Sequence, residues 1–353
     1  MKKICLLMSL MSVALSLWSQ NLVLGEEDSE DEIAIVGYFC KNDTMTFRET
    51  HNKYKIQDGD TTISDAYWED FMIVVSDSTS DGYKMKYIPL SFEYSEESDT
   101  VHRIMQGTLN QLMQSTVCEF STDELGQFQR IDNWREIREK LKGSVKIVCD
   151  SLYAAMPGLD SISPRRLAEG MLQLQFSTEK GIRESYEELD NLFGLHGNLF
   201  DVGDKELDSE ENGYPQHIVA RIGYIVVDDE EQDFDGDYAI LSQSTTLIPA
   251  EDVIDLGFGA VSMMMSDMVS DSLEVMRDAL IDSLKAAMPQ GVEMKVNEYY
   301  EFFFNGWPKE YYYEKIIDTG LGKDVETRHI EWISRHWNIY YSDDEKSNET
   351  QDI

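Results

Sequence analysis

The segment YYEFFFNGWPKEYYY, residues 299–313, places nine aromatic residues in fifteen positions. An Asn-Gly dipeptide is a strong short-range signal for the turn of a β-hairpin, and here it is formed by Asn305 and Gly306. Aromatic residues on both sides of the turn favour strands. The segment therefore predicts a hairpin whose rings either pack into the protein's own core or form a surface on which a ligand stacks.

The expected register of this hairpin depends on the length of its loop. A two-residue loop would set Glu301 opposite Glu310, which is an unfavourable pair of like charges. A four-residue loop, Asn305–Pro308, sets Tyr300 opposite Tyr313 and removes the proline, which has no N–H to donate, from the ladder. We therefore expect the longer loop.

The rings of the hairpin also suggest a binding site. Side chains alternate between the two faces of a strand, so one set of rings should face helices and the other set water or a partner. Methionine and phenylalanine suit the walls of an adaptable apolar groove. We expect such a groove between sheet and helices, with these candidate ligand-binding residues: Met265, Met276, Phe302, Phe304, Trp307, Tyr311 and Tyr313.

The rest of the chain mixes strand-like and helix-like patterns. Apolar residues spaced three and four apart predict helices at 132–157 and 265–288, and Ser163-Pro164 starts a helical centre at 163–197. This order predicts an α+β fold in which a curved antiparallel β-sheet packs on helices. Hydrophobic or alternating runs predict its strands at 32–40, 45–56, 69–94, 217–227, 237–248 and 326–341.

A short internal repeat suggests how this domain arose. The octapeptide DSLYAAMP at 150–157 recurs as DSLKAAMP at 282–289, and a hydrophobic hairpin lies next to each copy. We expect two related hairpin-and-helix halves, 33–160 and 216–341, around the helical centre at 163–197.

The amino terminus has the pattern of a Sec signal peptide. Lys2 and Lys3 precede a short apolar run, Ile4–Leu17, and small residues follow. The run is too short to span a membrane, and acidic residues follow it, so we expect an exported protein of the periplasm or the extracellular space. The expected division of the chain is a signal peptide at 1–19, an acidic disordered lead-in at 20–32, a single domain at 33–341 and a disordered tail at 342–353.

The chain is strongly acidic, with 68 Asp and Glu against 30 Lys and Arg and a net charge of −38 at pH 7. A field of this sign repels phosphate backbones and anionic lipid headgroups. We therefore expect no nucleic-acid partner and no docking on an acidic membrane. An apolar ligand or an envelope protein remains the expected partner.

One acidic stretch resembles the start of a calcium-binding loop. Glu231, Asp233, Asp235 and Asp237 alternate around Gly236, as oxygen ligands do in an EF-hand. The twelfth position holds a serine in place of the bidentate glutamate, and strand-like runs flank the loop. We expect at most a weak calcium site and otherwise no cofactor; the alternative is an acidic hairpin tip.

Sequence signatures of enzymes are scarce. The chain contains no G-x-S-x-G elbow, no H-E-x-x-H motif and no P-loop. Catalytic sets need not be local in sequence, so a hydrolase with a dispersed site is one alternative function. A surface recognition protein that uses an exposed tyrosine-rich hairpin is another.

Three stretches carry a resemblance to a known class of proteins. They are YKIQDGD at 54–60, FSTDELGQFQRIDNWREI at 120–137 and LFGLHG at 192–197, together with the leader that ends near WSQ. The chain resembles the uncharacterised secreted and periplasmic proteins of the Bacteroidota, and this resemblance implies a location in the cell envelope. By analogy with lipoprotein-carrier folds, we expect a non-enzymatic protein that binds an apolar ligand or a protein partner.

Overall fold

The computed structural model shows a large β-sheet with flanking helices. The residues that the structure describes are 22–23, 32–95, 116–156, 158, 160, 164–211, 213–225, 236–249, 252 and 291–337. The predicted signal peptide, the predicted helix at 265–288 and the tail at 342–353 lie outside these ranges.

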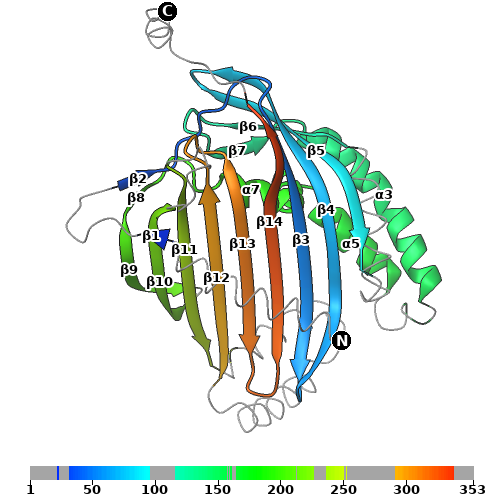
Figure 1. Cartoon of the computed structure of the whole chain (residues 1–353). Helices are drawn as coiled ribbons and strands as arrows, with labels where there is room; N and C mark the ends of the chain where they lie inside the picture. The colour runs from blue at the N-terminus through cyan, green and yellow to red at the C-terminus, as the bar shows by residue number, and fades with distance from the viewer. Residues whose placement is uncertain are drawn as a thin grey trace, which may run out of the picture.

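One large antiparallel sheet dominates the structure (Figure 1). Its strands follow the order β1-β10-β11-β12-β13-β14-β3-β4-β5-β6-β7, and β9 also pairs with β10. A separate two-stranded sheet consists of β2 (Glu32–Ala34) and β8 (Leu199–Asp201). The strands of the large sheet are β1 (Leu22–Val23), β3 (Thr44–Gln57), β4 (Asp60–Thr79), β5 (Gly82–Tyr94), β6 (Cys118–Thr122), β7 (Phe128–Ile131), β9 (Gly203–Glu211), β10 (Tyr214–Ile225), β11 (Tyr238–Ile248), β12 (Val292–Phe302), β13 (Pro308–Asp318) and β14 (Lys323–His336).

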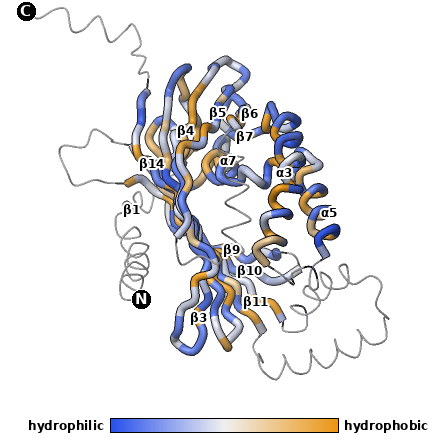
Figure 2. Tube along the Cα trace, turned by 90° about the vertical axis from the view of Figure 1, so that its right-hand side faces the viewer, coloured by the Kyte–Doolittle hydropathy of each residue, from blue (hydrophilic) through white to orange (hydrophobic). Residues whose placement is uncertain are grey.

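The described helices all lie on one face of this sheet (Figure 2), which we call the inner face. None of them is long and apolar enough to cross a membrane. They are α3 (Trp134–Ala155), α5 (Arg165–Gln175), α6 (Glu179–Arg183) and α7 (Glu187–Phe193), with a 3-10 turn at Glu184–Tyr186 between the last two.

The main core lies between the helices and the upper half of the inner face. Burial alternates along β3, where Met45 and Phe47 are fully buried and their neighbours are not. Ile137 and Leu141 of α3 bring the predicted apolar stripe of that helix to the same core. Burial of these side chains is the main favourable contribution to folding.

The predicted α+β fold with a curved antiparallel sheet is confirmed in its coarse form. Strand β9 was not predicted, because its sequence GDKELDSEE has no apolar alternation; it forms an edge strand by pairing with β10. The two related halves stay a prediction, since the second helix lies outside the described residues. Cys40, Cys118 and Cys149 are free thiols.

The aromatic segment forms the expected hairpin, but the predicted register was wrong. Tyr300 pairs with Tyr311, and Glu301 pairs with Glu310, which is the pairing we had disfavoured. The register then shifts between Glu301 and Phe302, so that Phe302 pairs with Pro308. The bulge places the proline at the end of the ladder, and residues 303–307 form the turn between Phe302 and Pro308.

Neighbouring strands compensate for the paired glutamates. Lys309, the residue in the bulge, forms ion pairs with Glu301 and with Asp237 of the adjoining segment, the latter at 3.1 Å. Glu310 is bonded instead to His329 Nε2 on β14, at 2.6 Å. Each glutamate therefore has its own polar partner, and the repulsion that sequence reasoning assigned to this pair is offset.

The hairpin turn docks against the rest of the core through its backbone. Gly306 has φ of +78°, and a side chain there would meet the Val36 carbonyl oxygen at 2.1 Å, so the position requires glycine. His196 Nε2 donates to the Gly306 carbonyl oxygen at 2.7 Å, and the neighbouring Trp307 is fully buried. Burial lowers the pKa of His196 to about 4, although these backbone hydrogen bonds work in the opposite direction.

We expect His196 to make the fold sensitive to acid. Its ordinary pKa of 6.5 applies to the unfolded chain, so the unfolded state takes up a proton that the folded state excludes between pH 6.5 and 4. Stability should be complete above pH 6.5 and fall by up to about 3 kcal/mol as the pH approaches 4. Urea denaturation of the wild type and of His196→Phe across this range measures the effect; equal slopes for both would contradict it.

Candidate functional site

A layer of polar side chains crosses the middle of the inner face, where the hydrophobic core ends. On β3, Glu49 and His51 follow Met45 and Phe47 on the same face, and both are buried. Buried charged groups are rare unless they are paired, so this layer needs a specific arrangement. We call it the polar belt; its residues are Glu49, His51, Asp65, Tyr67, Glu69, Glu187, Glu188, Glu326 and Arg328.

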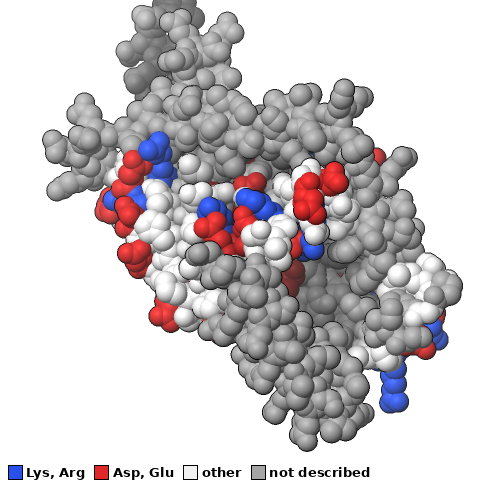
Figure 3. Space-filling model, turned by 90° about the horizontal axis from the view of Figure 1, so that it is seen from below, with Lys and Arg blue, Asp and Glu red and all other residues white. Residues whose placement is uncertain are grey.

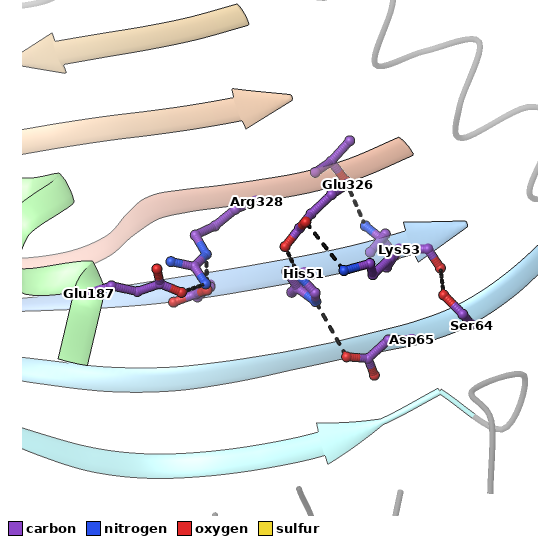
Figure 4. A network of polar contacts seen from close by, with 10 residues as sticks. His51, Lys53, Ser64, Asp65, Glu187, Glu326 and Arg328 are labelled. Atoms are coloured by element: carbon purple, nitrogen blue, oxygen red, sulfur yellow. Dashed lines mark hydrogen bonds and ion pairs between the residues drawn. The ribbon is translucent and has the colours of Figure 1, made fainter. Parts of the chain in front are cut away.

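Arg328 joins the sheet to helix α7 within the polar belt. Its Nε lies 2.9 Å from Glu49 Oε1 on β3, and its Nη2 is bonded to Glu187 at the start of α7 (Figure 4). Only 13% of the arginine side chain is exposed. Burial opposes its charge, yet the two glutamates hold its pKa above the ordinary value, so Arg328 stays charged.

Three carboxyl groups share this one guanidinium. Burial raises the pKa of Glu49, and it raises the pKa of Glu69 to about 8, with the charge of Glu49 adding to the effect. Glu188 on α7 is buried beside both, and its pKa is also well above its ordinary range, first because of burial. Tyr87 donates its hydroxyl to Glu69 at 3.1 Å. One arginine cannot neutralise three buried carboxylates, so part of this group is protonated near neutral pH.

His51 occupies the next position of the belt. Its Nε2 bonds Glu326 Oε1 at 3.2 Å and its Nδ1 lies 3.7 Å from Asp65 (Figure 4). Its ring also stacks on Tyr67. Glu326 also forms an ion pair with Lys53, with 3.5 Å between Nζ and Oε2. The hydrogen bond from His51 is the main cause that lowers the pKa of Glu326 to about 2, so this carboxylate is ionised.

The described residues of the polar belt include carboxylates but no hydroxyl or thiol bonded to its histidine. Within the part of the chain that the structure describes, no serine, threonine or cysteine side chain is bonded to His51, and Ser64 instead donates to the Lys53 carbonyl oxygen. Among the same residues, no group of three His, Cys, Asp or Glu side chains could hold a metal ion. The polar belt forms a charged boundary below the hydrophobic core.

The inner face continues beyond the polar belt, away from α7. Tyr311 packs in the core, and the same face of β13 continues through Tyr313, Lys315 and Ile317. We call this region the lower inner face. The residues assigned to it by strand register are Lys53, Lys55, Leu207, Gln216, Ile218, Ser244, Thr246, Met294, Val296, Lys315, Ile317 and Asp324.

The lower inner face is divided into an apolar and a charged part. In one row of paired residues, Ile218, Ser244 and Val296 cross β10 to β12. The row continues on β13 with Lys315 and then reaches Glu326 on β14. The next row contains Gln216, Thr246, Met294, Ile317 and Asp324, so its aliphatic residues lie on β12 and β13 and its charge lies on β14.

No described helix packs on this region, since α7 lies behind the upper half of the sheet (Figures 1 and 2). The lower edge of the sheet carries charges of both signs next to one another (Figure 3). They pair locally, as in Lys55–Asp324 at 3.3 Å and Lys323–Asp318 at 3.0 Å. An amphiphilic face thus lies between a charged belt above and a charge-balanced edge below.

The described residues among those predicted to line a groove lie in the core, at its edge or on the turn. Phe302, Trp307 and Tyr311 are buried in the core, and Phe304 is 53% exposed on the turn. Tyr313 is half-buried and packs at the edge of the core, while Met265 and Met276 lie outside the described residues. The rings of the hairpin therefore serve mainly to pack the core.

The alternative of an exposed tyrosine-rich hairpin is also not supported. Tyr311 and Tyr312 each have 3% of their surface exposed. The predicted calcium ligand Asp237 accepts hydrogen bonds from Lys309 and from the Phe304 N–H; Glu231, Asp233 and Asp235 lie outside the described residues.

Sequence reasoning missed the polar belt and the lower inner face. A signal was present in β3, where Glu49 and His51 occupy the alternate positions that follow the buried Met45 and Phe47. The partners of Glu49 and His51 come from β14 and α7, more than a hundred residues away, so the sequence alone did not bring them together.

Comparisons with known proteins give the chain no family. Neither a family model nor a curated protein sequence matches it. A structure titled for lipid–protein interactions in lipovitellin matches 86% of this chain at 8% identity with a TM-score of 0.37, and the chain spans only 26% of that protein. A putative outer membrane lipoprotein-sorting protein domain from Vibrio parahaemolyticus matches 85% of this chain and 88% of its own length at 8% identity, with a TM-score of 0.13. Likenesses this weak carry no argument about function.

We expect Glu69→Gln to stabilise the protein at alkaline pH. The folded pKa of about 8 lies above the ordinary 4.5, so the contribution of the protonated group is complete below pH 4.5 and is lost as the pH rises to 8. Glutamine keeps an acceptor for Tyr87 and carries no charge. The gain should be about 1–3 kcal/mol at pH 8 and near zero at pH 4.5.

Thermal unfolding across this pH range measures the gain, and the exposed Glu93→Gln on β5 is the control. Equal behaviour of the two variants would show that Glu69 is not held neutral by the polar belt.

Proposed function

We propose that this chain is a non-enzymatic protein of the cell envelope that binds an amphiphilic ligand on the lower inner face. One observation carries the proposal: aliphatic side chains of β10, β12 and β13 share this part of the face with Ser244 and Thr246 of the intervening strand β11, and no described helix packs on them. The aliphatic residues are Ile218, Met294, Val296 and Ile317, and all four are half-buried.

The composition of this face favours a ligand over simple solvent exposure. On the same strand β10, the outer face carries His217 and Arg221, whereas the inner face carries Ile218 and Ala220. Binding sites for small molecules are mostly apolar with a few placed polar groups, and this face has that character. Each buried aliphatic side chain contributes about 1.5–3 kcal/mol when it is removed from water.

The envelope location rests on the leader pattern at residues 1–19, which is a sequence argument. An origin in the secreted proteins of the Bacteroidota remains part of the same proposal. An exported carrier of an apolar molecule would need a face of this kind, because such ligands are poorly soluble in the aqueous space of the envelope.

The first test is native mass spectrometry of the protein purified from its own envelope. We expect an added mass of a few hundred to about a thousand daltons that organic solvent extracts as a lipid-like molecule. A clean mass of the polypeptide alone, together with no binding of the dye N-phenyl-1-naphthylamine, would contradict the proposal.

A matched pair of variants tests the location of the site. Ile218 and Val219 are neighbours on β10 that point to opposite faces, and Val219 is 44% exposed. A lysine at position 218 places a charge among the aliphatic side chains, so Ile218→Lys should weaken binding of the same dye at least about tenfold. Val219→Lys should leave it unchanged, and fluorescence titration distinguishes the two outcomes.

A further inference from the structure

Lys315 is unusual among the cations of the lower inner face. Lys53 is paired with Glu326, and Lys55 with Asp324. Lys315 sits between Val296 and Glu326 in the same row, yet it forms no ion pair within the described ranges. Lys315 is half-buried as a residue, and an anion that reached its ammonium would form a charge-assisted hydrogen bond without displacing an internal counter-ion.

The acids closest to Lys315 in the sheet already have other partners. Glu326 is held by His51 and Lys53, which keep it ionised and engaged. Glu298, one row nearer the polar belt, accepts the Tyr300 hydroxyl at 3.1 Å, and burial raises its pKa. Each of these two acids on the inner face thus has another polar partner, and neither forms an ion pair with Lys315 within the described ranges.

A second polar group in the apolar part also lacks a partner. Thr246 has 1% of its surface exposed, and its hydroxyl makes no hydrogen bond among the described residues. It lies next to Met294 in the row below Val296. A buried hydroxyl without an acceptor is costly, and a carbonyl oxygen from a ligand would satisfy it.

We infer that the ligand is a monoacyl ester with an anionic head group, which binds to Lys315 while the ester carbonyl accepts from Thr246. This inference rests on the proposed function and specifies its ligand class. The acyl chain would lie over Val296, Met294 and Ile218. The net charge of −38 does not prevent this, because charges farther away than about 8 Å are screened at physiological salt.

The test compares three probes that share a hexadecyl or palmitoyl chain. Palmitoyl lysophosphatidylglycerol has the ester and the phosphate, hexadecyl phosphate has only the phosphate, and hexadecanol has neither. Displacement of N-phenyl-1-naphthylamine from the purified full chain gives the affinity for each probe.

Lys315→Gln should weaken both phosphate-containing probes about tenfold and leave hexadecanol unchanged, because a charge-assisted hydrogen bond is lost. Lys315→Arg should retain most of the affinity. The control is Lys295→Gln on the outer face of β12, where Lys295 pairs with Glu293, and it should change none of the three. Thr246→Val should weaken only the ester, by about fivefold.

Two results would overturn the inference while the proposed function stands. One is an equal effect of Lys315→Gln on hexadecanol and hexadecyl phosphate, which would indicate a change in packing. The other is no effect of Lys315→Gln or Thr246→Val on any probe while Ile218→Lys abolishes dye binding. Failure of the wild type to bind the dye and all three probes would instead remove the proposed function itself.

Discussion

The Arg328 guanidinium, held between Glu49 on β3 and Glu187 on α7, is the interaction on which the arrangement of sheet and helices depends. A buried ion pair gains little over an apolar contact, but removing one partner leaves a charge that the interior cannot solvate. The arginine therefore holds the first residue of α7 against the inner face. The main hydrophobic core lies above this contact, and the lower inner face lies below it.

The polar belt holds more acids than its one buried arginine can neutralise. Glu49, Glu69 and Glu188 are tolerated because their raised pKa values let protons replace missing cations. Burial has the opposite effect at His196, which is held neutral. Alkaline pH therefore lowers the stability contributed by the polar belt, and acidic pH lowers the stability of the packing around the hairpin turn. Together the two effects place maximal stability at weakly acidic or neutral pH.

Patterns of alternation predicted most of the sheet, because strands such as β3 and β10 read as period-two sequences whatever their neighbours are. The hairpin register failed for a physical reason: repulsion between Glu301 and Glu310 was weighed as if only two strands existed. Contacts beyond the pairing of these two strands offset that repulsion. Lys309 in the bulge bonds Glu301 and Asp237 of the neighbouring segment, and His329 on a third strand bonds Glu310. The polar belt escaped prediction for the same reason, since its charges make sense only in three dimensions.

The lower inner face shows how the sheet itself can encode the chemistry of a ligand. One cross-strand row passes from Ile218 on β10 and Val296 on β12 to Lys315 on β13. A face that only met water would have little reason to gather aliphatic side chains from β10, β12 and β13, and a face that only packed on protein would have little reason to place a lysine without a counter-ion beside them. An amphiphile laid across the strands satisfies both requirements, with its chain on one side of the row and its charge on the other.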